Sequence, residues 1–161
     1  MEFYSPDIDL KKTFDAEIKD VEYISELNKI CKNVNVSYQD AMFIPHNLLT
    51  NWNEIAELEM FGDENTEDFD IDFYRDILFE IESIKSLSRF KEHKIFLKIL
   101  TTIDDKFKSY TFIPNELKNE KKWWNCCVFK KGTNEYINSI EQDMFDKFKI
   151  KIELKNRIER I

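Results

Sequence analysis

The chain has 161 residues, enough for a single domain, and a formal net charge of −8 from 32 acidic and 24 basic side chains. This charge excludes a general binder of nucleic acid or anionic membranes, because the phosphate contribution is repulsive overall. The 2 glycines, Gly62 and Gly132, are far apart, which excludes Gly-rich phosphate loops, dinucleotide fingerprints and nucleophile elbows, since each needs neighbouring glycines.

Helical periodicity dominates the first half of the chain. One stretch over about 13–34 carries a stripe of apolar residues: Phe14, Ile18, Val21, Leu27, Ile30 or Cys31, and Val34. The segment 35–46 fits no clear pattern, and Pro45 should end any helix before it. A second helix is predicted over about 47–61, with Asn51 and Glu54 as a capping box and Gly62 as a left-handed stop.

Two longer helices follow. The first covers about 67–87, with Thr66 as its N-cap and an apolar stripe of Phe69, Phe73, Ile77, Ile81 and Ile84. The second covers about 89–108, and the residues predicted to face the core are Phe96, Ile99 or Leu100, Ile103 and Phe107.

The C-terminal third leaves two alternatives open. Residues from Leu117 to about 130 fit a helix stopped by Gly132, but Trp123 to Phe129 equally fit a buried strand. Thr133 is predicted to cap a last helix, and after Phe148 the apolar residues alternate with polar ones. A short strand or hairpin near 148–154 therefore competes with a helix that simply continues.

We expect one mostly α domain over 1–161, an irregular bundle of five to seven helices. No apolar run approaches the 18 or so residues of a membrane span, and the acidic N-terminus lacks the features of a signal peptide. A cytoplasmic location is expected, where Cys31, Cys126 and Cys127 are reduced thiols. A vicinal disulfide between Cys126 and Cys127 is the alternative.

The charge is concentrated in two stretches. Residues 54–80, the acidic segment, hold eleven acids against Arg75 alone, for a net charge of −10. Residues 85–131, the basic segment, carry 12 bases and 5 acids, for a net charge of +7. Like charges four residues apart, such as Asp72 and Asp76, oppose helix formation. Two interpretations compete: the two segments pair inside the fold, or the acidic one faces a basic partner.

The candidate partner-binding residues are acids of this stretch, with two aromatic side chains as anchors. They are Glu57, Glu59, Asp63, Glu64, Glu67, Asp68, Asp70, Asp72, Asp76, Trp52 and Phe61.

No catalytic residue, cofactor or metal site is predicted. Asp68, Asp70 and Asp72 resemble the first half of a calcium loop, but Phe73 takes the position that needs Gly and Phe79 the position that needs Glu. Arg89 and His93 resemble the Arg–His motif of HEPN ribonucleases, yet only three residues separate them and the first is Phe90 rather than a polar residue. A helical ribonuclease using His93 is kept as an alternative.

The whole-chain profile is small and acidic, has no catalytic motif, and is rich in Ile, Lys, Asn and Phe as in AT-rich genomes. It resembles the immunity proteins of bacterial contact-dependent growth inhibition (CDI) systems. The resemblance implies a cognate toxin, commonly a nuclease, whose nucleic-acid groove the immunity protein plugs.

From this resemblance we expect a non-enzymatic inhibitor that binds a basic toxin of nuclease (RNase) type, as a monomer or 1:1 heterodimer, without direct contact to nucleic acid or membrane. The alternatives are a phage anti-restriction or anti-CRISPR acidic mimic and a regulatory scaffold that binds a partner helix.

Overall fold

The computed structural model describes residues 20–34, 45–58, 61–63 and 68–153. These form α2 (Val21–Val34), α3 (Pro45–Leu58), α4 (Asp68–Glu82), the 3₁₀ helix η2 (Lys85–Arg89) and α5 (Lys91–Lys108). The chain continues through β1 (Thr111–Phe112), η3 (Asn115–Leu117), η4 (Trp123–Cys126), β2 (Val128–Phe129) and α6 (Asn134–Phe148). The mostly α prediction is confirmed, with five α-helices in the described part of the chain.

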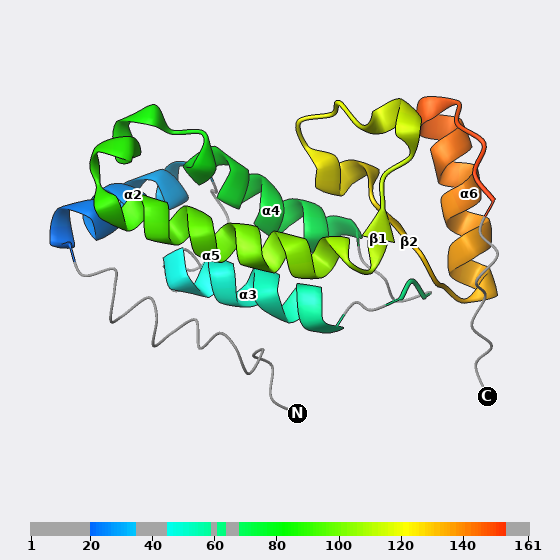
Figure 1. Ribbon diagram of the computed structural model, residues 1–161, viewed down its shortest axis with the longest axis horizontal. Helices are drawn as coiled ribbons and strands as arrows, with labels where there is room; N and C mark the ends of the chain where they lie inside the picture. Colours follow the sequence, from blue (N-terminus) through cyan, green and yellow to red (C-terminus); the bar gives the residue numbers. More distant parts are fainter. Residues whose placement is uncertain (1–19, 35–44, 59–60, 64–67, 154–161) are drawn as a thin grey trace.

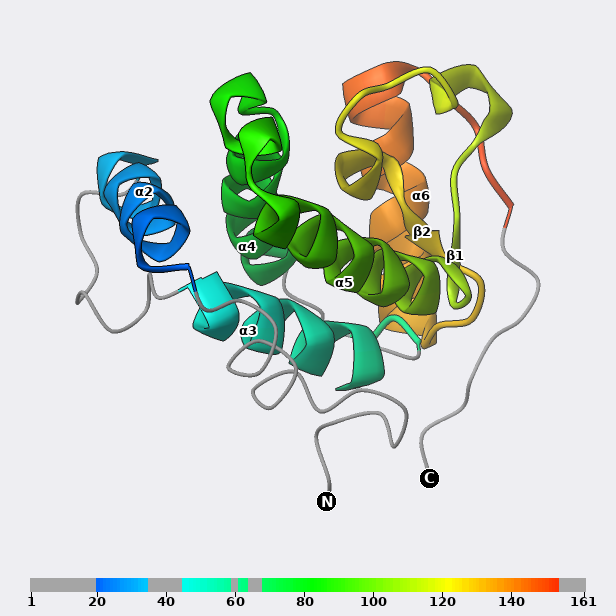
Figure 2. The same ribbon diagram turned by 60° about the vertical axis from the view of Figure 1, so that its left-hand side comes forward.

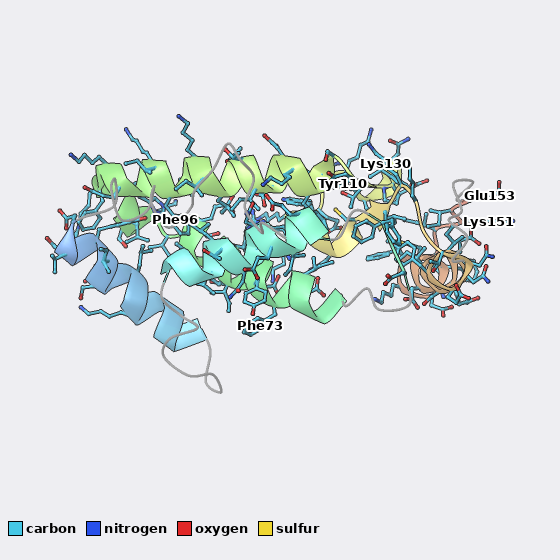
Figure 3. All side chains as sticks on the ribbon, turned by 90° about the horizontal axis from the view of Figure 1, so that it is seen from below. Phe73, Phe96, Tyr110, Lys130, Lys151 and Glu153 are labelled. Carbon is cyan, nitrogen blue, oxygen red and sulfur yellow. The ribbon has the colours of Figure 1, made fainter. Side chains whose placement is uncertain are left out.

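Helices α2 to α5 pack together at one end of the structure, and β1, β2 and α6 lie at the other end (Figure 1). Helix α3 packs against α5 and α4, and α2 packs against α4 and α3. Figure 2 shows α3 running beneath α5, with the β1–β2 hairpin between α5 and α6. Figure 3 shows Phe96 within the helical group and Lys151 and Glu153 at the opposite end, beyond α6.

Helix α5 has a regular apolar face. Its inward face carries Phe96, Leu100, Ile103 and Phe107, all buried, at the spacing of one helical face. The prediction for about 89–108 is therefore confirmed with the start two residues later. Ile99 and Leu100, between which the sequence left a choice, are both buried.

A side-chain hydrogen bond caps the start of two helices, α2 and α6. The Asp20 carboxylate accepts a hydrogen bond from the Tyr23 backbone N–H at 3.0 Å, and α2 begins at Val21. The predicted part of this helix over 13–19 lies outside the described residues. The Thr133 hydroxyl accepts one from the Tyr136 N–H, which confirms the predicted cap of α6. The predicted cap Thr66 lies outside the described residues.

Both glycine predictions are wrong. Neither Gly62 nor Gly132 has a positive φ, so neither ends a helix in the left-handed conformation. The predicted capping box is also wrong, because Asn51 lies inside α3. The two glycines form a parallel bridge with each other, and the Gly62 N–H donates to the Lys131 carbonyl at 2.9 Å. A Cβ atom at either position would collide with the ring of Tyr136, so the close approach of ring and backbone requires glycine there.

The strand pairs lie elsewhere than expected. Thr111 pairs with Phe129 and Phe112 with Val128 in an antiparallel sheet. The predicted strand from Trp123 to Phe129 is therefore confirmed only for its last two residues. Residues 149–153 are neither helix nor strand, so the strand near 148–154 is wrong for this described portion. Helix α6 ends because Lys149 adopts a left-handed conformation with φ 58°.

The core has a charged centre. Arg75 of α4 is 2% exposed. Its Nε donates to Asp104 Oδ1 at 3.0 Å and its Nη2 donates to Asp104 Oδ2 at 2.9 Å and to Glu82 Oε2 at 3.0 Å. Trp52 Nε1 donates to the same Asp104 oxygen at 2.9 Å. The Arg75 guanidinium lies 4.4 Å from the Trp124 ring centroid, and its Nη1 has no hydrogen-bond partner among the described residues.

We predict that Asp104→Asn lowers the free energy of unfolding by about 3 kcal/mol or more, because it leaves a buried guanidinium without its main counter-charge. Glu82→Gln, which alters the half-exposed carboxylate on the same guanidinium, should cost about 1 kcal/mol or less. Denaturant unfolding of both variants measures the difference. Equal losses would contradict a central role for Asp104.

Candidate functional site

The acidic segment is spread over α3, α4 and the connection between them. Glu57 and Asp63 are half-buried, as are Asp72 and Asp76. Glu59, Glu64 and Glu67 lie outside the described residues. Asp68 and Asp70 belong to α4, but their side chains are not described.

Part of this acidity is paired within the fold. Lys106 Nζ of α5 donates to Glu57 Oε1 at 2.7 Å and to Asn53 Oδ1 at 2.7 Å. Asp76 accepts a hydrogen bond from Trp124 Nε1 at 2.9 Å and lies 3.5 Å from Lys122 Nζ. In the described part of the chain, these two pairs join an acid of the acidic segment to a lysine of the basic segment. The intramolecular interpretation is thus realised at these two places.

Much of the basic segment points elsewhere. Lys91, Lys94 and Lys98 are exposed along one side of α5, at helical spacing. No ion pair links them to the described acids of 54–80. The pairing of the two segments is therefore partial.

Trp52 is not a surface anchor, and the prediction for it is wrong. Its side chain is 0% exposed, because α3 turns this position toward α5, where the ring packs 5.0 Å from that of Phe107. Its indole N–H is used by Asp104. Phe61, the second predicted anchor, is half-buried.

His93 is placed in the core rather than at an accessible site. The side chain is 3% exposed, its Nδ1 lies 3.0 Å from the Tyr23 hydroxyl, and its ring stacks on Phe96. Burial lowers the pKa of His93, while burial and the nearby Glu92 charge raise the pKa of Tyr23. These groups tie α2 to α5.

Arg89 points away from this arrangement. Its Nη2 donates to Glu22 Oε1 at 2.9 Å on the surface. The two residues that resemble the ribonuclease motif are thus engaged by different partners, one on the surface and one in the core.

One cavity lies between α4, η4 and α6. Its volume is about 50 Å³, which is space for about four water molecules. Its wall is largely aromatic and aliphatic, and the charged side chains lining it are Asp72, Asp143 and Lys147. Asp72 is the predicted site residue that this cavity includes.

Sequence reasoning missed Asp143. This residue lies in the C-terminal part of the chain, where acids and bases balance, so its local charge gives no signal. Only the packing of α6 beside α4 and η4 places Asp143 and Asp72, 71 positions apart, on one cavity.

The two described cysteines are free thiols. Cys126 is buried and Cys127, which lines the cavity, is half-buried. Burial raises the pKa of Cys127 to about 12, so the reactive thiolate is disfavoured at neutral pH. Cys31 lies in α2, but its side chain is not described.

Within the described ranges, no group of three or more His, Cys, Asp or Glu side chains could hold a metal ion. None of the described helices is both long enough and apolar enough to cross a membrane. Comparison of the chain with protein-family models, curated proteins and solved structures finds no match in any of the three.

We predict that stability falls as the pH drops from 7 to 5.5. His93 has a folded-state pKa below its unfolded value of about 6.5, so the unfolded state binds more protons in this range. The urea midpoint of the wild type should fall over this interval, and His93→Gln should reduce that fall. The same pH dependence in both proteins would contradict the prediction.

Proposed function

We propose that the protein is an immunity-type inhibitor that binds and neutralises a basic bacterial toxin of nuclease type. The proposal combines the CDI-like profile of the chain with the placement of its charges. In the proposed complex with the toxin, carboxylates of the acidic segment take the place of nucleic-acid phosphates in the basic cleft of the toxin.

The observation that carries the proposal is the burial of Arg75. This is the single base of the acidic segment, and it is enclosed by Asp104, Glu82 and two tryptophans. Every charged group that residues 54–80 offer to solvent is therefore acidic. Such a surface accelerates association with a basic partner and makes it dependent on salt.

The internal ion pairs narrow the candidate surface. Glu57 is shared with Lys106, and Asp76 holds Trp124 and Lys122, so both acids serve the fold. Glu54, half-buried on α3, and Glu80, exposed on α4, are the better probes of binding. Trp52 is not part of the surface, because its indole belongs to the core.

The ribonuclease alternative has less support. It requires His93 to reach an RNA phosphate, but the side chain is buried and engaged with Tyr23. The anti-restriction alternative uses the same chemistry, and no contact of the described residues favours it over a toxin inhibitor.

We predict that Glu54→Lys combined with Glu80→Lys slows association with the toxin by roughly tenfold or more at low salt, because the steering charge is reversed. The candidate partner is the product of the gene adjacent to the coding gene, tested for growth inhibition. Binding is measured by surface plasmon resonance at two salt concentrations, together with protection of growth.

The matched control is Glu116→Lys combined with Glu135→Lys. These two acids are exposed, lie outside the acidic segment, and give the same change in net charge. An equal effect of both double variants would show that only total charge matters. Unchanged binding and protection in Glu54→Lys/Glu80→Lys would overturn the proposed surface.

A further inference from the structure

The cavity between α4, η4 and α6 combines an aromatic wall with two carboxylates. Its wall includes the aromatic residues Phe107, Trp124, Phe129, Tyr136 and Phe148. Two carboxylates, Asp72 and Asp143, line the same space from α4 and α6. Aromatic rings attract cations through their electron-rich faces, and carboxylates supply the counter-charge and the hydrogen-bond acceptors.

We propose that this cavity receives an arginine side chain of the partner. The inference rests on the proposed function, and it assigns one recognition element within the complex. A guanidinium is planar, weakly hydrated and always charged, so it stacks on rings and pairs with carboxylates at a lower desolvation cost than an ammonium.

The chain itself contains an example of this chemistry. The Arg75 guanidinium lies 4.4 Å from the ring centroid of Trp124, and it is held by the Asp104 carboxylate through two hydrogen bonds. Trp124 is also a wall of the cavity. A second guanidinium in the cavity would thus meet the same indole, with Asp143 in the role that Asp104 has for Arg75.

The carboxylate of Asp143 is not neutralised by its neighbour on α6. Lys147, one turn later, is exposed, and no salt bridge between Asp143 and Lys147 is present within the described residues. By formal charge the lining residues sum to −1, from Asp72 and Asp143 against Lys147. Lys147 opposes a bound cation, so its removal should strengthen binding.

The volume of the cavity and its access from solvent fit the end of one side chain rather than a larger ligand. The volume of about 50 Å³ suits a group of a few heavy atoms. The polar lining residues Asp72, Asn125, Asp143 and Lys147 are half-buried or exposed, which gives an inserted side chain a path from solvent. This is the arrangement of an anchor residue that inserts into a pocket at an interface.

The direct test needs no partner. N-acetyl-L-arginine amide is titrated into the full chain and followed by ¹H–¹⁵N NMR at the Trp124 indole and the Asn125 amide. We expect saturable shifts with a Kd on the order of 1–10 mM. N-acetyl-citrulline amide, of the same shape without the charge, should give no saturable shift.

Variants test the assigned groups. Asp143→Asn should weaken binding of N-acetyl-L-arginine amide roughly fivefold or more, and Lys147→Met should strengthen it, since each changes one charge of the lining. Asp146→Asn is the matched control, because Asp146 is exposed on the same helix and does not line the cavity. Circular dichroism confirms that each variant is folded.

The outcomes separate the two proposals. Equal shifts with the citrulline probe, or no effect of Asp143→Asn, overturn the arginine site, whatever the acidic segment does in a complex. Binding of the arginine probe with unchanged affinity of Asp143→Asn for the toxin overturns the role of the cavity in the interface. Loss of toxin binding in Glu54→Lys/Glu80→Lys tests the proposed function independently, because those residues do not line the cavity.

Discussion

The pairing of Arg75 with Asp104 is the constraint on which the rest of the structure depends. A guanidinium withdrawn from water is tolerated only with a well-placed counter-charge and satisfied hydrogen bonds. Here the carboxylate comes from α5, the supporting indole N–H from α3, and the stacked ring from η4. Desolvation raises the pKa of Asp104, and Arg75 and Trp52 act against that rise. The pair therefore fixes how α3, α4 and α5 meet one another and how η4 packs on them.

The sequence predicts what depends on local pattern and misses what depends on distant contacts. Helix α5 is foreseen because its apolar face repeats regularly, and the start of α6 because Thr133 is a good N-cap. Strands of two residues are too short to show alternation, so the partner strand β1 is not foreseen. For the site, the acidity of 54–80 is visible, but its partners Lys106 and Lys122 are almost fifty positions away. The prediction of Trp52 as a surface anchor is wrong because an aromatic residue near acids in the sequence is as compatible with a core as with an interface.

Charged side chains of the same sequence segment have different roles in the fold. Glu57 and Asp76 stabilise contacts between elements, and Arg75 is removed from the surface. The lysines Lys91, Lys94 and Lys98 stay exposed on the outer side of α5, and Glu80 stays exposed on α4. Exposed charges of opposite sign on different helices can orient a charged partner before contact.

The bridge between Gly62 and Gly132 has a consequence for the order of folding. It joins backbone positions 70 residues apart, and closing a loop of that length costs considerable chain entropy before any contact compensates. Helix α5 and its neighbour η2 are close in sequence and form without such a closure. The Tyr136 ring packs closely against both glycines. We therefore expect α5 and η2 to form early and the contact of the Tyr136 ring with the two glycines to be a late step of folding.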